Sequence, residues 1–177
     1  MLLIILLLSF ITMICVLLIF MKHKYDELSN IIYKIGVSEN DINTKLKEEE
    51  DLVNRCINII ERKTNLKENV LLEIKNIKSE KFNNIDKDKL LTLGRNKIIS
   101  ILDIKPELNK IKSFPDMITD LKNIEEELIA LRTYYNFNVK RYNKYILKFP
   151  YNIISKLKKY KVKSLYEGEI IKKESKN

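Results

Sequence analysis

The chain has 177 residues, of which 45% are hydrophobic and 32% are charged, and its formal net charge at pH 7 is +9. Three Gly, three Pro and no Trp leave little material for tight β-turns, so the composition favours helices. One His and two Cys cannot supply a metal cluster, a Ser/His/Asp set or a Cys/His pair, so we expect no catalytic residue, metal or cofactor and no small-molecule substrate.

The N-terminal segment from Leu2 to Met21 is an uncharged run of twenty residues. At 1.5 Å per residue a helix of this length spans about 30 Å, the thickness of the hydrocarbon core of a bilayer. No Lys or Arg precedes the run, and residues 20–23 lack the small side chains of a signal-peptide cleavage site. We therefore expect residues 1–21 to be a retained transmembrane anchor.

The orientation of this anchor follows from the charges that flank it. Lys22 and Lys24 come directly after the run, whereas only the terminal amine precedes it. The positive-inside rule then places the N-terminus outside and the C-terminal domain in the cytoplasm of a single-pass protein of the cell membrane. The opposite topology is the alternative, because two lysines are few.

Beyond the anchor, a heptad-like apolar stripe continues without proline from residue 22 to residue 63. Glu39 and Glu49 interrupt the stripe, and Gly36 weakens helix propensity. We expect one long helix, continuous with the membrane segment and kinked near residues 36–38. The stripe consists of Leu28, Ile32, Ile35, Ile42, Leu46, Val53, Cys56 and Ile60.

Two shorter helices are predicted next. The first carries apolar residues at 66, 70, 74 and 77, and a polar loop over residues 78–86 follows it. Asp86 or Asp88 is the expected N-cap of the other helix. That helix carries the apolar residues Leu90, Leu91, Ile98, Ile101 and Leu102. Pro106 and Pro115 bracket the next interruption of the helical pattern.

A last long helix is predicted over residues 116–149, after a Ser113 cap and Pro115 in the first turn. Its apolar stripe needs a partner surface, and the stripe of the first long helix is the candidate. We therefore predict an all-α fold: an N-terminal transmembrane helix followed, over residues 22–150, by an antiparallel four-helix-type bundle with long first and last helices. The stripe is Met117, Leu121, Ile124, Leu128, Leu131, Tyr135, Val139, Tyr142, Ile146 and Phe149.

The last helix repeats Tyr-Asn after seven residues, at 135–136 and 142–143, which places both pairs on one side. We interpret Tyr135 and Tyr142 as core residues whose hydroxyls bond Asn136, Asn143, Glu39 or Glu49, with a recognition role as the alternative. The acidic runs at 47–51 and 125–127 are interpreted as solvated helix faces.

Residues 151–177 form a basic amphipathic segment and tail. In an up-down-up-down bundle the last helix returns toward the membrane, so this segment can rest on an anionic leaflet. A solvated basic helix that caps the bundle is the alternative. The lysines proposed to contact the membrane surface are Lys148, Lys156, Lys158, Lys159, Lys161 and Lys163.

The spacing of the C-terminal motif, behind a single N-terminal anchor, resembles the LemA family. The resemblance covers most of the chain and implies an α-helical bundle at the bacterial cell membrane, without a catalytic residue set. It departs at Asn54, where the family has proline, and at residues 155–160, where the family has Gly and Phe. The residues that match the family signature, interpreted as structural, are Arg132, Tyr135, Asn136, Val139, Tyr142, Asn143, Ile146, Phe149, Pro150 and Asn152.

Three classes of function remain to be weighed. The leading one is a non-catalytic, membrane-anchored structural or interaction protein that contacts the lipid bilayer and an unidentified protein partner. The alternative is a membrane-tethered protein that binds nucleic acid or anionic lipid, which the net charge of +9 favours. No helix-turn-helix, Gly-rich or zinc pattern supports binding of nucleic acid. An enzyme is the third and weakest class.

Overall fold

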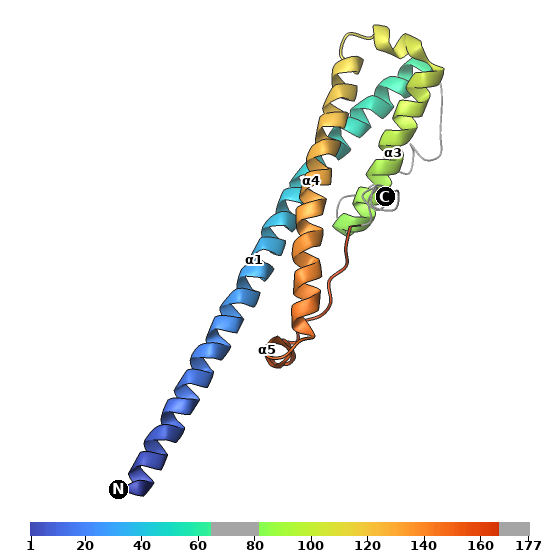
Figure 1. Cartoon of the computed structure of the whole chain (residues 1–177). Coiled ribbons are helices and arrows are strands. Elements are labelled where there is room, and N and C mark those ends of the chain that lie inside the picture. The colour runs from blue at the N-terminus through green and yellow to red at the C-terminus, as the bar shows by residue number, and fades with distance from the viewer. Residues whose placement is uncertain (65–81, 167–177) are drawn as a thin grey trace, which may run out of the picture. The chain divides into compact units, whose positions relative to one another are not determined.

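The computed structural model describes residues 1–64 and 82–166, and within these ranges the chain contains helices and no strand. The predicted all-α fold with a long N-terminal apolar helix is therefore confirmed. The helix predicted around residues 66–77 lies outside the described residues. The elements in chain order are α1 (Leu2–Thr64), α3 (Asn84–Ile104), a 3₁₀ helix η1 (Pro106–Lys110), α4 (Phe114–Ile146) and α5 (Tyr151–Lys158), shown in Figure 1.

The chain forms two compact units, and α1 and α4 each contribute to both. The first unit contains Met1–Val37 and Tyr135–Leu165, and the second contains Ser38–Tyr134 and resumes at Tyr166. The boundaries predicted after residues 21 and 150 divide the chain by a different criterion, anchor against bundle against basic segment, and stay predictions.

The helix α1 continues from the apolar run through Gly36 to Thr64 without interruption. A Cβ added at Gly36 would meet nothing within 4 Å. The expected stripe is buried except at Ile32, which is half-buried because the buried face passes through Ile31 instead. Two polar residues, Ser38 and Glu49, are also buried on this stripe.

In the second unit, the ion pairs between helices define their directions. Asp88 and Arg95 on α3 pair with Arg132 and Glu125 on α4, in reverse order along the chain, so these two helices are antiparallel. The start of α3 meets Glu39, and Arg95 further along α3 meets Glu49, so α1 and α3 are parallel. Helices α1, α3 and α4 thus lie side by side within this unit (Figure 1), as in a bundle.

The start of α3 corrects the predicted cap. The Asn83 side chain accepts a hydrogen bond from the backbone N–H of Asp86 at 2.9 Å, so Asn83 is the N-cap. Asp86 lies in the first turn and accepts from the Asn83 amide at 2.7 Å. Asp88 is buried and ion-paired rather than a cap.

The helix α4 begins at Phe114, two residues before the predicted start at 116, and ends before the predicted residue 149. The Met117 N–H bonds the Ser113 carbonyl at 3.2 Å in the first turn. The last helical residue is Ile146, not Phe149, and the Phe149 side chain is 75% exposed instead of continuing the stripe. Proline restricts the residue before it as well as lacking its own N–H, so the helix ends before Phe149.

Candidate functional site

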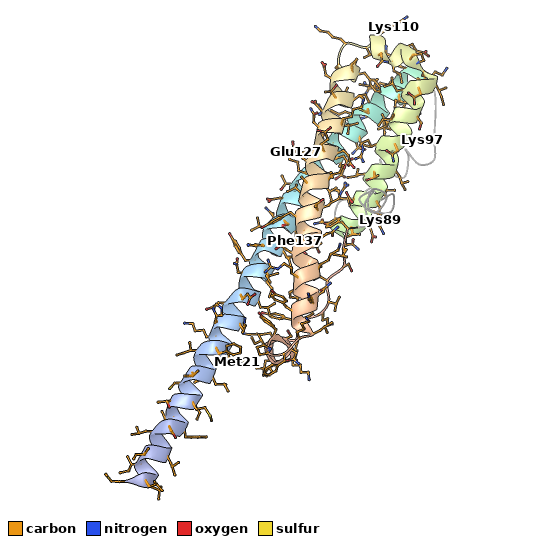
Figure 2. The ribbon with its side chains drawn as sticks, viewed as in Figure 1. Met21, Lys89, Lys97, Lys110, Glu127 and Phe137 are labelled. Atoms are coloured by element: carbon orange, nitrogen blue, oxygen red, sulfur yellow. The ribbon has the colours of Figure 1, made fainter. Side chains whose placement is uncertain are left out.

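The apolar end of α1 belongs to the first unit and lacks any packing partner there. Every side chain from Leu2 to Phe20 is exposed, and Figure 2 shows them standing out from the helix on the N-terminal side of Met21. Among the described residues, α1 is the one helix long and apolar enough to cross a bilayer. The chain thus carries a candidate membrane span at its N-terminus.

Side-chain contacts hold the short helix α5 against the part of α1 that follows this apolar run. The Tyr151 hydroxyl donates a hydrogen bond to Glu27 Oε2 at 2.6 Å, and Lys24 Nζ lies 3.2 Å from the same carboxylate oxygen. The Lys24 ammonium also lies 5.5 Å from the Tyr151 ring centroid. The Tyr145 ring of α4 stacks on Tyr151 with 4.7 Å between centroids. The Tyr151 hydrogen bond, followed by Lys24, lowers the pKa of Glu27.

The signature tyrosines are buried, at 4% exposed for Tyr135 and 3% for Tyr142. The partners predicted for their hydroxyls are wrong, because both bond backbone carbonyls of the extended segment after α5. Tyr135 donates to the Ser164 carbonyl at 3.2 Å, and Tyr142 donates to the Lys161 carbonyl at 3.0 Å. Both partners belong to an extended stretch that residue periodicity does not reveal.

Asn143 holds the same extended segment through two hydrogen bonds. Its amide donates to the Lys163 carbonyl at 2.8 Å, and its Oδ1 accepts from the Lys163 backbone N–H at 2.9 Å. The Asn143 side-chain amide thus bonds both the N–H and the carbonyl of Lys163, as a backbone residue of a neighbouring β-strand would. The Tyr-Asn repeat therefore anchors residues 161–164 on α4.

The remaining signature residues divide between the two units. In the first unit Val139, Ile146 and Pro150 are buried, whereas Asn136 and Asn152 are half-buried. Arg132 belongs to the second unit.

The predicted membrane-contact lysines lie on or beside α5. All are exposed except Lys163, which is half-buried where it meets Asn143. Lys159 adopts the left-handed conformation with φ 54° and ends α5, while the Tyr160 N–H bonds the Ser155 carbonyl at 2.9 Å. Large apolar residues are exposed among these lysines: Leu147, Phe149, Ile153, Leu157 and Val162.

The second unit contains a buried network of charged side chains from all three of its long helices. Arg95 of α3 contacts Glu49 of α1 and lies 2.7 Å from Glu125 of α4. Arg132 lies 2.6 Å from Asp88 and 3.3 Å from Glu125. The two arginines therefore share Glu125 and link the helices at one level of the bundle.

The network corrects the interpretation of the acidic runs as solvated faces. Glu49 is fully buried, and Glu125 is mostly covered by the two arginines. Burial raises the pKa of Glu49 to about 7 despite the charge of Arg95, and burial also raises the pKa of Asp88. The sequence carried a signal for Glu49, because this residue occupies a position on the apolar stripe.

Two open grooves flank the ion pair between Lys45 and Glu127, whose atoms are 2.7 Å apart. One groove has a volume of about 430 Å³, and its lining includes Asp41, Thr44 and Leu131. The other, of about 400 Å³, is lined by Glu48, Asp51, Arg55 and Asp120 among others. Carboxylates outnumber cations in the lining of the second groove, in contrast to the basic charge of the whole chain.

Across residues 1–64 and 82–166, no group of three or more His, Cys, Asp or Glu side chains is placed to hold a metal ion. Cys56 is buried, and burial raises the pKa of its thiol to about 11.

Comparison with known proteins yields one family. The sequence model of the LemA family matches residues 38–177, which include α3, α4 and the whole Tyr-Asn signature. No curated protein matches the chain.

Proposed function

Because the chain belongs to the LemA family, we propose that it is a non-catalytic structural or interaction protein of the bacterial cell membrane. Residues 1–21 anchor it, and the helical bundle is presented to a protein partner. The observation that carries this proposal is the continuity of α1: one helix holds both the exposed apolar run and the buried stripe of the bundle.

The exposure of this run supports the anchor. Burial of a Leu, Ile or Phe side chain contributes roughly 1.5–3 kcal/mol, and none of the side chains from Leu2 to Phe20 is buried by the protein. A bilayer would cover them all. Lys22 and Lys24 at the end of the run favour an external N-terminus and a cytoplasmic bundle.

A non-catalytic role is supported by the environment of the buried carboxylates. Arginine side chains form ion pairs with all three carboxylates of the network, Glu49, Asp88 and Glu125. Neither groove is lined by Glu49 or Asp88. Such a network fixes the register of the helices relative to one another.

The grooves beside Lys45 and Glu127 suggest where a protein partner would bind. Their excess of carboxylates would favour a partner segment with basic side chains. A photo-crosslinking residue at the exposed Asn123, which lines the groove with the excess of carboxylates, should capture a protein in cells. The same residue at the exposed Ser100 of α3 serves as the control. Identical adducts at both positions would argue against a specific partner at the groove.

Topology is tested by cysteine labelling of intact cells. Cys15 is replaced by Ala, while Cys56 can stay because its thiol is buried and poorly ionised. A cysteine at Ser100 is then treated with a membrane-impermeant thiol reagent. Protection until the cells are lysed supports a cytoplasmic bundle, whereas labelling of intact cells would reverse the topology. A chain found in the soluble fraction would refute the anchor itself.

A further inference from the structure

We propose that the turn after α4, the outer face of α5 and the C-terminal end of α5 form a binding surface for anionic phospholipid headgroups, next to the point where α1 leaves the bilayer. The surface consists of Leu147, Phe149, Ile153, Leu157 and the lysines Lys148, Lys156, Lys158 and Lys159. This inference rests on the proposed membrane anchor and adds to it a second, lipid-specific contact.

The first observation is the exposure of large apolar side chains in one short stretch of chain. Leu147 is 72% exposed, Phe149 is 75% exposed and Leu157 is 78% exposed. A cluster of solvent-exposed large apolar side chains is typical of a surface that binds a membrane or another molecule.

The second observation is the amphipathic character of α5. Tyr151, Ile154 and Ser155 form its buried face. Ile153, Lys156 and Leu157 lie on the opposite face, because residues three and four positions apart share one side of a helix. An outer face that combines Leu, Ile and Lys is typical of helices that lie in the headgroup region of a membrane.

The third observation is charge. No acidic residue occurs between Lys144 and Tyr166, and Lys148, Lys156, Lys158 and Lys159 are all exposed. A surface with several lysines and no carboxylate of its own complements an anionic leaflet. The apolar residues among the lysines would enter the boundary between headgroups and acyl chains, which a nucleic acid does not offer.

The fourth observation is position, and it lies entirely within the first unit. The Tyr151–Glu27 hydrogen bond and the Lys24–Tyr151 contact hold α5 beside the part of α1 that follows Met21. Lys24 Nζ also lies 5.8 Å from the ring centroid of Phe20, within the apolar run. If the run spans the bilayer, α5 lies at the level of the headgroups.

The experiment uses the full chain reconstituted in vesicles, with Cys15 replaced by Ala. A cysteine at Leu157 carries an environment-sensitive fluorophore, and the vesicles are phosphatidylcholine alone or phosphatidylcholine mixed with phosphatidylglycerol. The matched control is Tyr33→Cys, an exposed position of the same unit about 18 Å further along α1 than Met21. We expect a blue shift of emission at position 157 with phosphatidylglycerol and none at position 33.

Replacement of Lys156, Lys158 and Lys159 by Gln should abolish most of that shift. Each lysine near an anionic surface strengthens association about fivefold, so the triple change should weaken the contact on the order of a hundredfold. Added salt should act in the same direction. Circular dichroism of each variant checks that the helices are retained.

The remaining outcomes each overturn the proposal in a recognisable way. Vesicle flotation measures anchoring separately: a chain that does not float refutes the anchor and with it this surface. A floating chain with equal emission at position 157 in both lipids refutes the lipid-binding surface alone. A shift produced by duplex DNA but not by phosphatidylglycerol would assign the lysines to nucleic acid instead.

Discussion

At the scale of single residues, the second unit contains a network of buried charged side chains. Arg95 and Arg132 between them contact Glu49, Glu125 and Asp88. Two cations facing three carboxylates leave an excess of negative charge in a buried place. Desolvation raises the pKa of Glu49 to about 7, the charge of Arg95 opposes this rise, and the charges of Glu125 and Asp88 add to it.

Glu49→Gln should remove a component of the pH dependence of stability. Because the folded-state pKa of Glu49 is raised from 4.5 to about 7, the unfolded chain releases the proton first as pH rises. Stability from this group is therefore full below about pH 4.5 and is lost between pH 4.5 and 7, by roughly 3 kcal/mol. In detergent, the melting temperature of the variant relative to wild type should rise by several degrees from pH 5 to pH 8.

The control for this experiment is the exposed neighbour of the network, Glu126. Glu126→Gln should leave the pH profile of the melting temperature unchanged. Asp88 is present in all three chains and interacts with Glu49, so the difference between Glu49→Gln and wild type reports Glu49 together with its effect on Asp88. A difference between Glu49→Gln and wild type that stays constant across this range would show that Glu49 is ionised throughout.

Arg132→Met should destabilise the protein by about 3–5 kcal/mol, because it leaves the buried Asp88 carboxylate without its cation. The double variant Asp88→Asn with Arg132→Met removes both charges and should recover about 1–3 kcal/mol of that loss. Chemical denaturation in detergent is measured for four chains: wild type, Arg132→Met, Asp88→Asn and the double variant. If the double variant is as unstable as the sum of the single changes, the two residues are not coupled.

At the scale of elements, the sequence predicted helices well and the packing of polar residues poorly. The apolar stripes of α1 and α4 repeat in steps of three and four, so residues such as Leu46 and Leu128 fell on the buried faces as expected. The ion pair of Glu49 cannot be predicted from its place in the apolar stripe, because its partner Arg95 lies on a different helix and no local pattern relates the two.

The signature tyrosines illustrate the same limit. Their burial follows from the helical stripe, but the carbonyls that accept their hydrogen bonds lie in an extended segment with no periodicity. The end of α4 differs from the prediction for a local reason, because Pro150 disfavours helical backbone at Phe149 as well as lacking its own N–H. The position of α5 beside Glu27 depends on a contact between residues far apart in the chain.

Asn143→Ala should release the segment that follows α5 without unfolding the helices. The variant loses two hydrogen bonds to Lys163, each worth about 0.5–1.5 kcal/mol. Amide exchange at Lys163 should become about tenfold faster or more, while exchange in the core of α4 stays the same. Lys144→Ala, at an exposed neighbouring position, is the control. Unchanged exchange at Lys163 would mean that other contacts hold the segment.

At the scale of the whole molecule, the N-terminal apolar run contributes little to the stability of the folded part, although the two share one helix. Buried positions on α1 begin at Leu28, and every residue up to Phe20 is exposed. The apolar run thus contributes to membrane attachment in the proposed function and contributes little to the folding of the units. Its removal should therefore alter localisation without altering stability.

A chain that starts at Met21 should remain helical and unfold cooperatively, with a melting temperature close to that of the full chain in the same detergent. The reason is that residues 2–20 bury nothing within the protein, and the Lys24–Phe20 contact is a weak one at an exposed site. Leu28→Ala provides the comparison, because it empties a buried position of the first unit and should cost about 2–5 kcal/mol in either chain. A truncated chain that loses cooperative unfolding would mean that the apolar run supports the fold, and the separation of anchor from bundle would then be wrong.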